Sequence, residues 1–184
     1  MESVRMAVVS DTHVPDRTPG LSEEFLAALR SQKFDLILHA GDICVQSVLT
    51  ELEKIAPVLA VTGNRDFLLR RQIPMMQRFD RFGVKFALAH GHMNPFTYWG
   101  DKFLYVTKGY DRDRYIKRLV AAAPDASVIV FGHTHHAENF WQDGRLFFNP
   151  GSITYGDYLL RQRSWGILEA FEDGRVQGTI CEID

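Results

Sequence analysis

Five predicted strands of this chain each end in a side chain that can bind a metal ion, and this pattern restricts the fold. Short apolar runs bounded by turn residues are typical of buried strands. In open α/β sheets, ligands bind beyond the carboxyl ends of the strands, so we expect these side chains to converge. The strands and the residues at their ends are Val4–Ser10 with Asp11 and His13, Asp35–His39 with Asp42, residues 58–64 with Asn64, Gln77–Ala89 with His90, and Ser127–Phe131 with His133 and His135.

The segments between these strands predict an α/β fold. The first three strands alternate with helix-like segments, which is typical of parallel βαβ units. The later part of the chain carries turn residues between alternating strands, which is typical of antiparallel hairpins. We expect one domain over residues 1–184. Its other predicted elements are helices at Leu21–Ser31 with Ser22 as N-cap, at Val45–Ile55 and at Tyr98–Ala123 with a break around residues 108–111, and hairpin turns near Gly83, at Asp143–Gly144 and at Asp173–Gly174.

Composition excludes several classes of partner. The net charge of −2 gives no footprint for a nucleic-acid polymer, and no apolar run approaches the ~20 residues that span a bilayer. The first residues lack the pattern of a secretory signal. The two cysteines, Cys44 and Cys181, are too few for a disulfide framework. We therefore expect a cytoplasmic protein without a membrane partner.

The candidate ligands indicate a two-metal site. Asp11 and His13 are two residues apart, as are His133 and His135, so in extended backbone each pair points to one side. Imidazole, carboxylate and amide oxygen without thiolate suit Mn, Fe, Zn or Ni. Seven ligands are too many for one tetrahedral zinc ion. They suit two metals ~3.5–4 Å apart that share a bridging carboxylate. Such a pair can hold a hydroxide and stabilise the attacking and leaving oxygens of an in-line displacement at phosphorus.

Each residue also has a simpler interpretation. A single Asp or His at a strand end is commonly a turn former, and Asn64 could supply only a left-handed turn. His39 is expected to pack in its strand or to hydrogen-bond to a ligand, whereas His92 and His136 are expected to line the cleft. The metal-site hypothesis therefore depends on the whole set, because five separate strand ends each supply a ligand type.

Five motifs in order make the sequence similar to the calcineurin-like metallophosphoesterase superfamily. Within this superfamily the chain resembles the small prokaryotic phosphodiesterases, which also carry an "NPGS" segment, here Asn149–Ser152. The resemblance extends from residue 4 to the C-terminal strands. The motifs are "DTH" at 11–13, "GD" at 41–42, "GNRD" at 63–66, "HGH" at 90–92 and "GHTH" at 132–135.

The resemblance implies a four-layer α/β/β/α sandwich of two mixed sheets flanked by helices. It also implies two divalent metals, with Mn the usual choice and Fe, Ni, Zn or Mg as alternatives. A hydroxide that bridges the metals or is terminal on one of them would attack phosphorus in line. The implied ligands are Asp11, His13 and His135 for the first metal, Asp42 as the bridge, and Asn64, His90 and His133 for the second.

One residue departs from the pattern of larger family members. Many of them have His after the Asn, where it is thought to protonate the leaving group, and this chain has Arg65. The pKa of arginine lies above ~12, so Arg65 cannot act as that acid. It could bind a phosphate oxygen or point to solvent. We expect a preference for phosphodiesters with good leaving groups, or another acid such as His92 or a metal-bound water.

Two further function classes remain open at this stage. A non-catalytic or weakly catalytic metal-binding scaffold would resemble the retromer subunit of the same fold, although all seven ligands are present here. A Ser/Thr protein phosphatase would resemble "GDxVDRG" and "GNHE", where this chain has "GDICVQS" and "GNRD". Substrate choice is expected to come from surrounding loops, including the aromatic loop 94–115. The C-terminal hairpins could pair with a second copy in a homo-oligomer.

Overall fold

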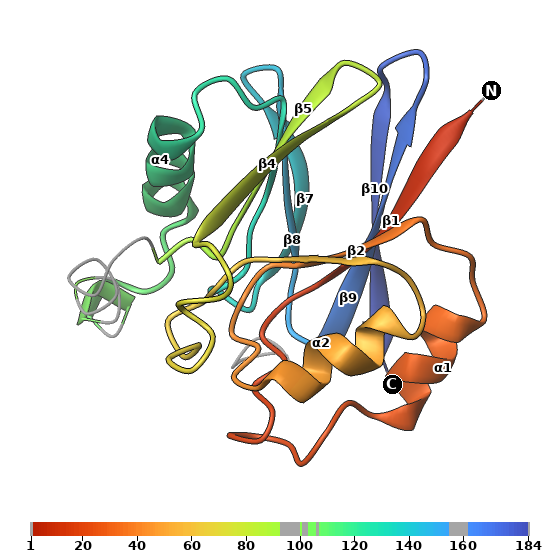
Figure 1. Ribbon diagram of the computed structural model, residues 1–184. Helices are drawn as coiled ribbons and strands as arrows, with labels where there is room; N and C mark the ends of the chain where they lie inside the picture. The colour runs from red at the N-terminus through yellow and green to blue at the C-terminus, as the bar shows by residue number, and fades with distance from the viewer. Residues whose placement is uncertain (1, 93–99, 101–102, 106, 155–161, 184) are drawn as a thin grey trace.

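The computed structural model describes residues 2–92, 100, 103–105, 107–154 and 162–183, and these form two mixed five-stranded sheets (Figure 1). The first sheet has the order β10-β9-β1-β2-β3, and the second has the order β4-β5-β6-β8-β7. The strands are β1 Ser3–Val9, β2 Leu36–His39, β3 Val58–Ala60, β4 Met76–Arg81, β5 Val84–Ala89, β6 Val128–Val130, β7 Ala137–Gln142, β8 Arg145–Pro150, β9 Arg163–Phe171 and β10 Val176–Ile183.

The first third of the chain forms the expected parallel units. Strand β1 pairs in parallel with β2, and β2 pairs in parallel with β3. Helix α1, Glu23–Arg30, connects the first two strands, and helix α2, Gln46–Glu53, connects the next two. Ser22 caps α1, because its side chain accepts a hydrogen bond from the Phe25 N–H at 3.3 Å. Both helices lie on the outer face of the first sheet (Figure 1).

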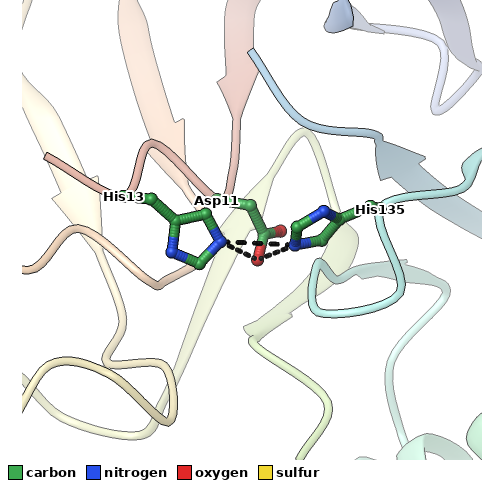
Figure 2. Close-up of side chains that lie close together, drawn as sticks. All are labelled: Asp11, His13 and His135. Carbon is green, nitrogen blue, oxygen red and sulfur yellow. Dashed lines mark hydrogen bonds and ion pairs between the residues drawn. The ribbon is translucent and has the colours of Figure 1, made fainter. Parts of the chain in front are cut away.

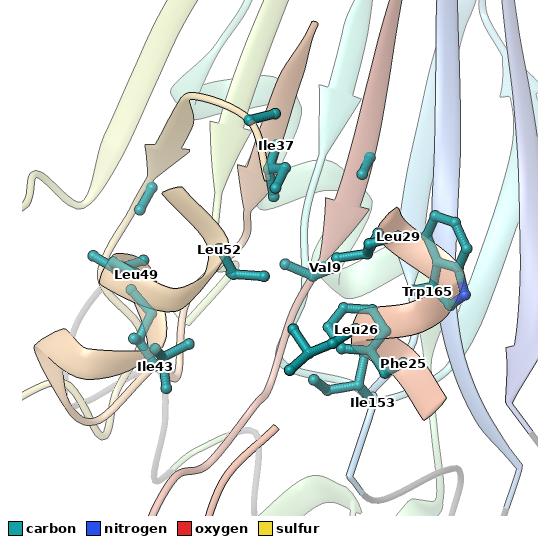
Figure 3. Close-up of a cluster of buried hydrophobic side chains, with 14 of the residues drawn as sticks. Val9, Phe25, Leu26, Leu29, Ile37, Ile43, Leu49, Leu52, Ile153 and Trp165 are labelled. Atoms are coloured by element: carbon teal, nitrogen blue, oxygen red, sulfur yellow. The ribbon is translucent and has the colours of Figure 1, made fainter. Parts of the chain in front are cut away.

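Three apolar clusters separate four layers. One cluster packs α1 and α2 against the outer face of the first sheet, with Phe25, Leu29 and Trp165 among its residues (Figure 3). A second cluster fills the space between the two sheets, and a third packs helix α4, Arg112–Ala122, against the outer face of the second sheet. The expected four-layer α/β/β/α sandwich is therefore confirmed.

The later elements follow the predicted pattern, including the break expected in the long helix. Turns at residues 82–83 and 143–144 and at Asp173–Gly174 join antiparallel strand pairs, as expected. The expected helix Tyr98–Ala123 is divided at residues 109–111, and α4 covers only its second part. Residues 100, 103–105 and 107–108 are helical, and the rest of the first part lies outside the described residues. Among the described residues, no helix has the length and apolar character to cross a membrane.

Candidate metal centre

Three candidate ligands from distant parts of the chain meet at the ends of β1 and β6. The His135 Nε2 atom lies 3.2 Å from Asp11 Oδ1, and the His13 Nε2 atom lies 3.7 Å from the same oxygen. The two imidazole Nε2 atoms are 3.3 Å apart (Figure 2). All three residues are buried. Their ligand atoms are close enough together to share one cation.

A second group lies beside the first, around Asn64. The Asn64 Oδ1 atom is 3.2 Å from His90 Nε2 and 3.0 Å from His133 Nδ1. These three residues follow β3, β5 and β6. The amide oxygen and two ring nitrogens form a donor set of the kind that holds a divalent transition metal.

Asp42 connects the two groups. Its Oδ1 atom lies 3.5 Å from His90 Nε2, and its Oδ2 atom lies 3.8 Å from His13 Nδ1. Asp11 also approaches both groups, because its Oδ1 atom lies 3.9 Å from His90 Nε2. Both carboxylates thus lie between residues of the two groups, and Asp11, Asp42 and His90 have ligand atoms within 4.8 Å of one another.

His133 and His135 enter different groups although they belong to the same turn. The His135 ring faces Asp11 and His13, while the His133 ring faces Asn64 and lies 5.0 Å from the His90 ring, centroid to centroid. The division expected between these two histidines is therefore present in the arrangement of their side chains.

The backbone at these pairs is not extended, so that expectation was wrong. The φ angles are 54° at Asp11, 49° at His13, 72° at His133 and 61° at His135, all in the left-handed region. Hydrogen bonds between loops hold the first pair there, because the Asp11 N–H donates to the Gly41 carbonyl and the His13 N–H donates to the Asp42 carbonyl, both at 2.9 Å. Left-handed backbone costs about 1–3 kcal/mol per non-glycine residue and is concentrated at functional sites.

The hydrogen bonds of Asp11 leave one of its oxygens for a cation. Its Oδ2 atom accepts bonds from Ser10 Oγ at 2.5 Å and from the His133 N–H at 3.0 Å. Its buried Oδ1 atom has no hydrogen-bond partner among the described residues. A buried carboxylate oxygen without a donor is costly unless a cation neutralises it, so the site fits a bound metal.

His90 has the tautomer that metal binding needs. Its Nδ1 atom lies 2.7 Å from the Ala40 carbonyl oxygen, which only accepts hydrogen bonds, so Nδ1 carries the proton. The Nε2 atom is then directed to Asn64 and Asp42. A backbone carbonyl that fixes the tautomer of a ligating histidine is a common feature of metal sites.

Burial also shifts the pKa values of three other candidate ligands. Burial lowers the pKa of His13 to about 3 and holds the pKa of His133 well below its ordinary value, so both rings are neutral near pH 7. Burial and the charge of Asp11 raise the pKa of Asp42 to about 6. Neutral imidazoles beside carboxylates are the protonation states in which these residues bind metal.

Asp66 was not singled out in the sequence, although it joins two of the ligand loops. It is fully buried, and its Oδ1 and Oδ2 atoms accept the Cys44 and Gly63 N–H groups, each at 2.6 Å. The bonds connect the loop that carries Asp42 to the loop that carries Asn64. The Asp that ends the "GNRD" motif could have indicated this role, but Asp is common in turns for other reasons, so the residue alone does not predict it.

The "NPGS" segment hydrogen-bonds to two further loops that carry candidate ligands, those after β1 and β6. The Asn149 Nδ2 group donates to the Gly132 carbonyl at 3.1 Å and to Thr134 Oγ1 at 3.0 Å. Ser152 Oγ and Thr154 Oγ1 both donate to the Asp11 carbonyl, at 2.9 and 3.0 Å. The motif therefore holds the loops after β1 and β6 in place.

The remaining histidines lie around the cluster. His39 is fully buried, and its Nδ1 atom accepts the Gly41 N–H while its Nε2 atom contacts Thr12 Oγ1. His92 is buried edge-on against the His90 ring, and burial lowers its pKa to about 3. His136 stacks on Tyr110 with ring centroids 4.1 Å apart.

Arg65 contacts the centre through its backbone and an acidic residue through its side chain. Its N–H group donates to Asp42 Oδ1 at 2.8 Å, and its Nη1 atom lies 3.2 Å from Asp16 Oδ2. The guanidinium group is thus partly exposed and is paired with a carboxylate.

Comparisons with known proteins show which family the chain resembles. A family model described as the calcineurin-like phosphoesterase superfamily domain matches residues 4–170. A probable metallophosphoesterase of Methanothermobacter thermautotrophicus is 34% identical over 149 residues, which cover 81% of this chain and 77% of that protein. Vacuolar protein sorting-associated protein 29 of Schizosaccharomyces pombe is 27% identical over 147 residues, which cover 80% of this chain and 71% of that protein. A crystal structure of Vps29 from Entamoeba histolytica complexed with Zn²⁺ has a TM-score of 0.73 at 23% identity and covers 98% of this chain and all of that one.

Proposed function

The chain belongs to the calcineurin-like phosphoesterase superfamily, and from its gathered ligand residues we propose that it is a metal-dependent phosphodiesterase for small phosphoesters. The observation that carries the proposal is the pair of adjacent donor groups, Asp11 with His13 and His135, and Asn64 with His90 and His133. We assign Asp42 as the bridge between them, because its Oδ1 atom lies 3.5 Å from His90 Nε2 and its Oδ2 atom lies 3.8 Å from the His13 ring.

The residues of the chain would provide the position and charge that hydrolysis needs. Two divalent cations in these groups would supply Lewis acidity and an activated water. The buried carboxylates of Asp11 and Asp42 would fix the cations, and the Ala40 carbonyl would keep the His90 Nε2 lone pair directed at its cation.

Arg65 leads us to propose a preference for good leaving groups. It stands where many larger relatives have His, and its guanidinium group keeps its proton. We assign the residue a role in substrate binding instead, next to the bridging carboxylate that its N–H contacts. A series of phosphodiesters with graded leaving-group pKa tests the preference for good leaving groups. The rate is expected to fall steeply as leaving-group pKa rises, and a flat dependence would refute that preference.

A phosphoester panel tests the proposed function itself. The protein is stripped of metal, reloaded separately with Mn, Fe, Ni, Zn or Mg, and assayed with bis-p-nitrophenyl phosphate, cyclic nucleotides, nucleotides and phosphoserine. We expect metal-dependent turnover of diesters, with Mn among the effective ions. The matched variant is Asp42→Asn, which keeps the side-chain size but removes the bridging charge, and it is expected to lose more than a hundredfold in kcat/KM.

A non-catalytic scaffold is the second candidate, because the chain is similar to a vacuolar protein sorting-associated protein. Stoichiometric metal binding without turnover of any ester in the panel would favour it. The proposal also includes Mn as the cation and the cytoplasm as the location, in keeping with the free Cys44 and Cys181. The first part of the aromatic loop 94–115, whose role the sequence left open, lies largely outside the described residues.

A further inference from the structure

One ion pair lies where three ligand-bearing loops meet. Asp16 follows His13 by three residues, Cys44 follows Asp42 by two, and Arg65 directly follows Asn64. The Asp16 Oδ2 atom lies 3.2 Å from Arg65 Nη1 and 3.8 Å from Cys44 Sγ. The Asp16–Arg65 pair therefore belongs to the rim of the candidate metal centre.

The Asp16–Arg65 pair lies close to the candidate metal centre, and an anionic ligand could replace Asp16 as the partner of Arg65. The Arg65 N–H is bonded to the Asp42 carboxylate at 2.8 Å, which anchors this residue beside the proposed bridge. The side chains of Arg65 and Asp16 are 39% and 42% exposed. An ion pair between side chains this exposed is weak, so an anionic ligand can compete with Asp16 for the guanidinium group.

The charge of the ligand decides how much Arg65 matters. A phosphomonoester carries close to two negative charges at pH 7, because its second pKa is about 6, whereas a phosphodiester carries one. A free guanidinium group binds phosphate oxygens bidentately and would favour the dianion. Paired with Asp16, the same group adds almost no net charge to the rim.

We propose that Asp16 makes the centre selective for phosphodiesters over phosphomonoesters by holding and neutralising Arg65. This inference rests on the proposed function and names the substrate class of the same site. Asp16 is a specificity-determining residue in this account, since it acts on the substrate through Arg65 and not on the metals.

Kinetics of two related esters test the inference. The ratio of kcat/KM for p-nitrophenyl phosphate to kcat/KM for bis-p-nitrophenyl phosphate is measured at pH 7.5 in the Mn-loaded protein. Asp16→Asn is expected to raise this ratio about fivefold. The same substitution in an Arg65→Gln background is expected to leave the ratio unchanged, because the charge that Asp16 masks is then absent.

A matched control removes a similar ion pair elsewhere. Asp125 lies 3.3 Å from Arg78 Nη1 with comparable exposure, at the amino end of β6 and so at the opposite end from His133. Asp125→Asn removes one negative charge from the surface, and it is expected to leave the ratio unchanged. An equal increase in Asp16→Asn and Asp125→Asn, or no increase in Asp16→Asn, would overturn the inference without affecting the proposed function.

Equilibrium binding of inorganic phosphate separates the two proposals. By calorimetry on the metal-loaded protein, Asp16→Asn is expected to bind phosphate about fivefold more tightly than the wild type, and the increase is expected to vanish with Arg65→Gln. If no ester is hydrolysed, the proposed function fails, and this binding difference still decides the role of Asp16. Unchanged phosphate affinity, or none in any variant, contradicts that role.

Discussion

Replacing Asp66 by Asn tests how strongly a single buried carboxylate positions the metal centre. Its two oxygens accept the Cys44 and Gly63 N–H groups at 2.6 Å, and no part of the side chain is exposed. Asn has nearly the same size, but its amide nitrogen replaces one acceptor and the remaining bond loses its charge. One buried N–H is then left without an acceptor, so we expect the free energy of unfolding to fall by about 2–4 kcal/mol.

The assay is urea denaturation of the metal-free protein, followed by metal titration under native conditions. Because Asp66 connects the loops of Asp42 and Asn64, we expect Mn affinity to fall at least tenfold even where the variant is fully folded. The matched control is Asp80→Asn, since Asp80 Oδ1 accepts the Gly83 N–H at 2.9 Å in an exposed turn. That control is expected to change stability by less than about 0.5 kcal/mol. Equal stability of the two variants, or normal Mn affinity in the Asp66 variant, would refute the reasoning.

Two further predictions concern buried positions around the ligands. A Cβ at Gly132 would lie against Ser10 Oγ and 2.9 Å from Asp11 Oδ2, so Gly132→Ala is expected to weaken Mn binding at least tenfold. Calorimetry measures this change. The control is Gly20→Ala, whose added Cβ meets nothing within 4 Å and is expected to leave Mn affinity unchanged. Burial lowers the pKa of His39 to about 3. As the pH falls, this histidine is therefore protonated in the unfolded chain before it is protonated in the folded protein. Its contribution to stability is present above about pH 6.5 and is lost as the pH falls toward 3. In denaturation at several pH values, the free energy of unfolding should therefore fall less steeply with decreasing pH in His39→Gln than in the wild type. Identical slopes in the two proteins would contradict this.

The convergence of the candidate ligands could be predicted from the sequence because they follow strand ends. The apolar runs before Asp11, Asp42 and Asn64 form parallel strands, and parallel strands bring their carboxyl ends to one edge. The Asp143–Gly144 pair likewise has the residues that a tight hairpin turn requires. These features depend on local patterns that a single sequence carries.

The local backbone and the supporting contacts could not be predicted in the same way. Left-handed φ angles at Asp11 and His135 are unfavourable locally and are held by contacts between loops, which leave no local signature. Asp66 and Ser152 act through hydrogen bonds to residues 22 and 141 positions away in the chain. The partner of Arg65, Asp16, lies 49 positions away, so sequence reasoning left that side chain between two alternatives.

The most direct test of the two-metal account is anomalous diffraction from crystals of the Mn-loaded protein. The account predicts two Mn peaks about 3.5–4 Å apart, with Asp42 between them. His135 should contact the peak held by Asp11 and His13, and His133 should contact the peak held by Asn64 and His90. A single peak at full metal loading, or both histidines on one ion, would contradict the account.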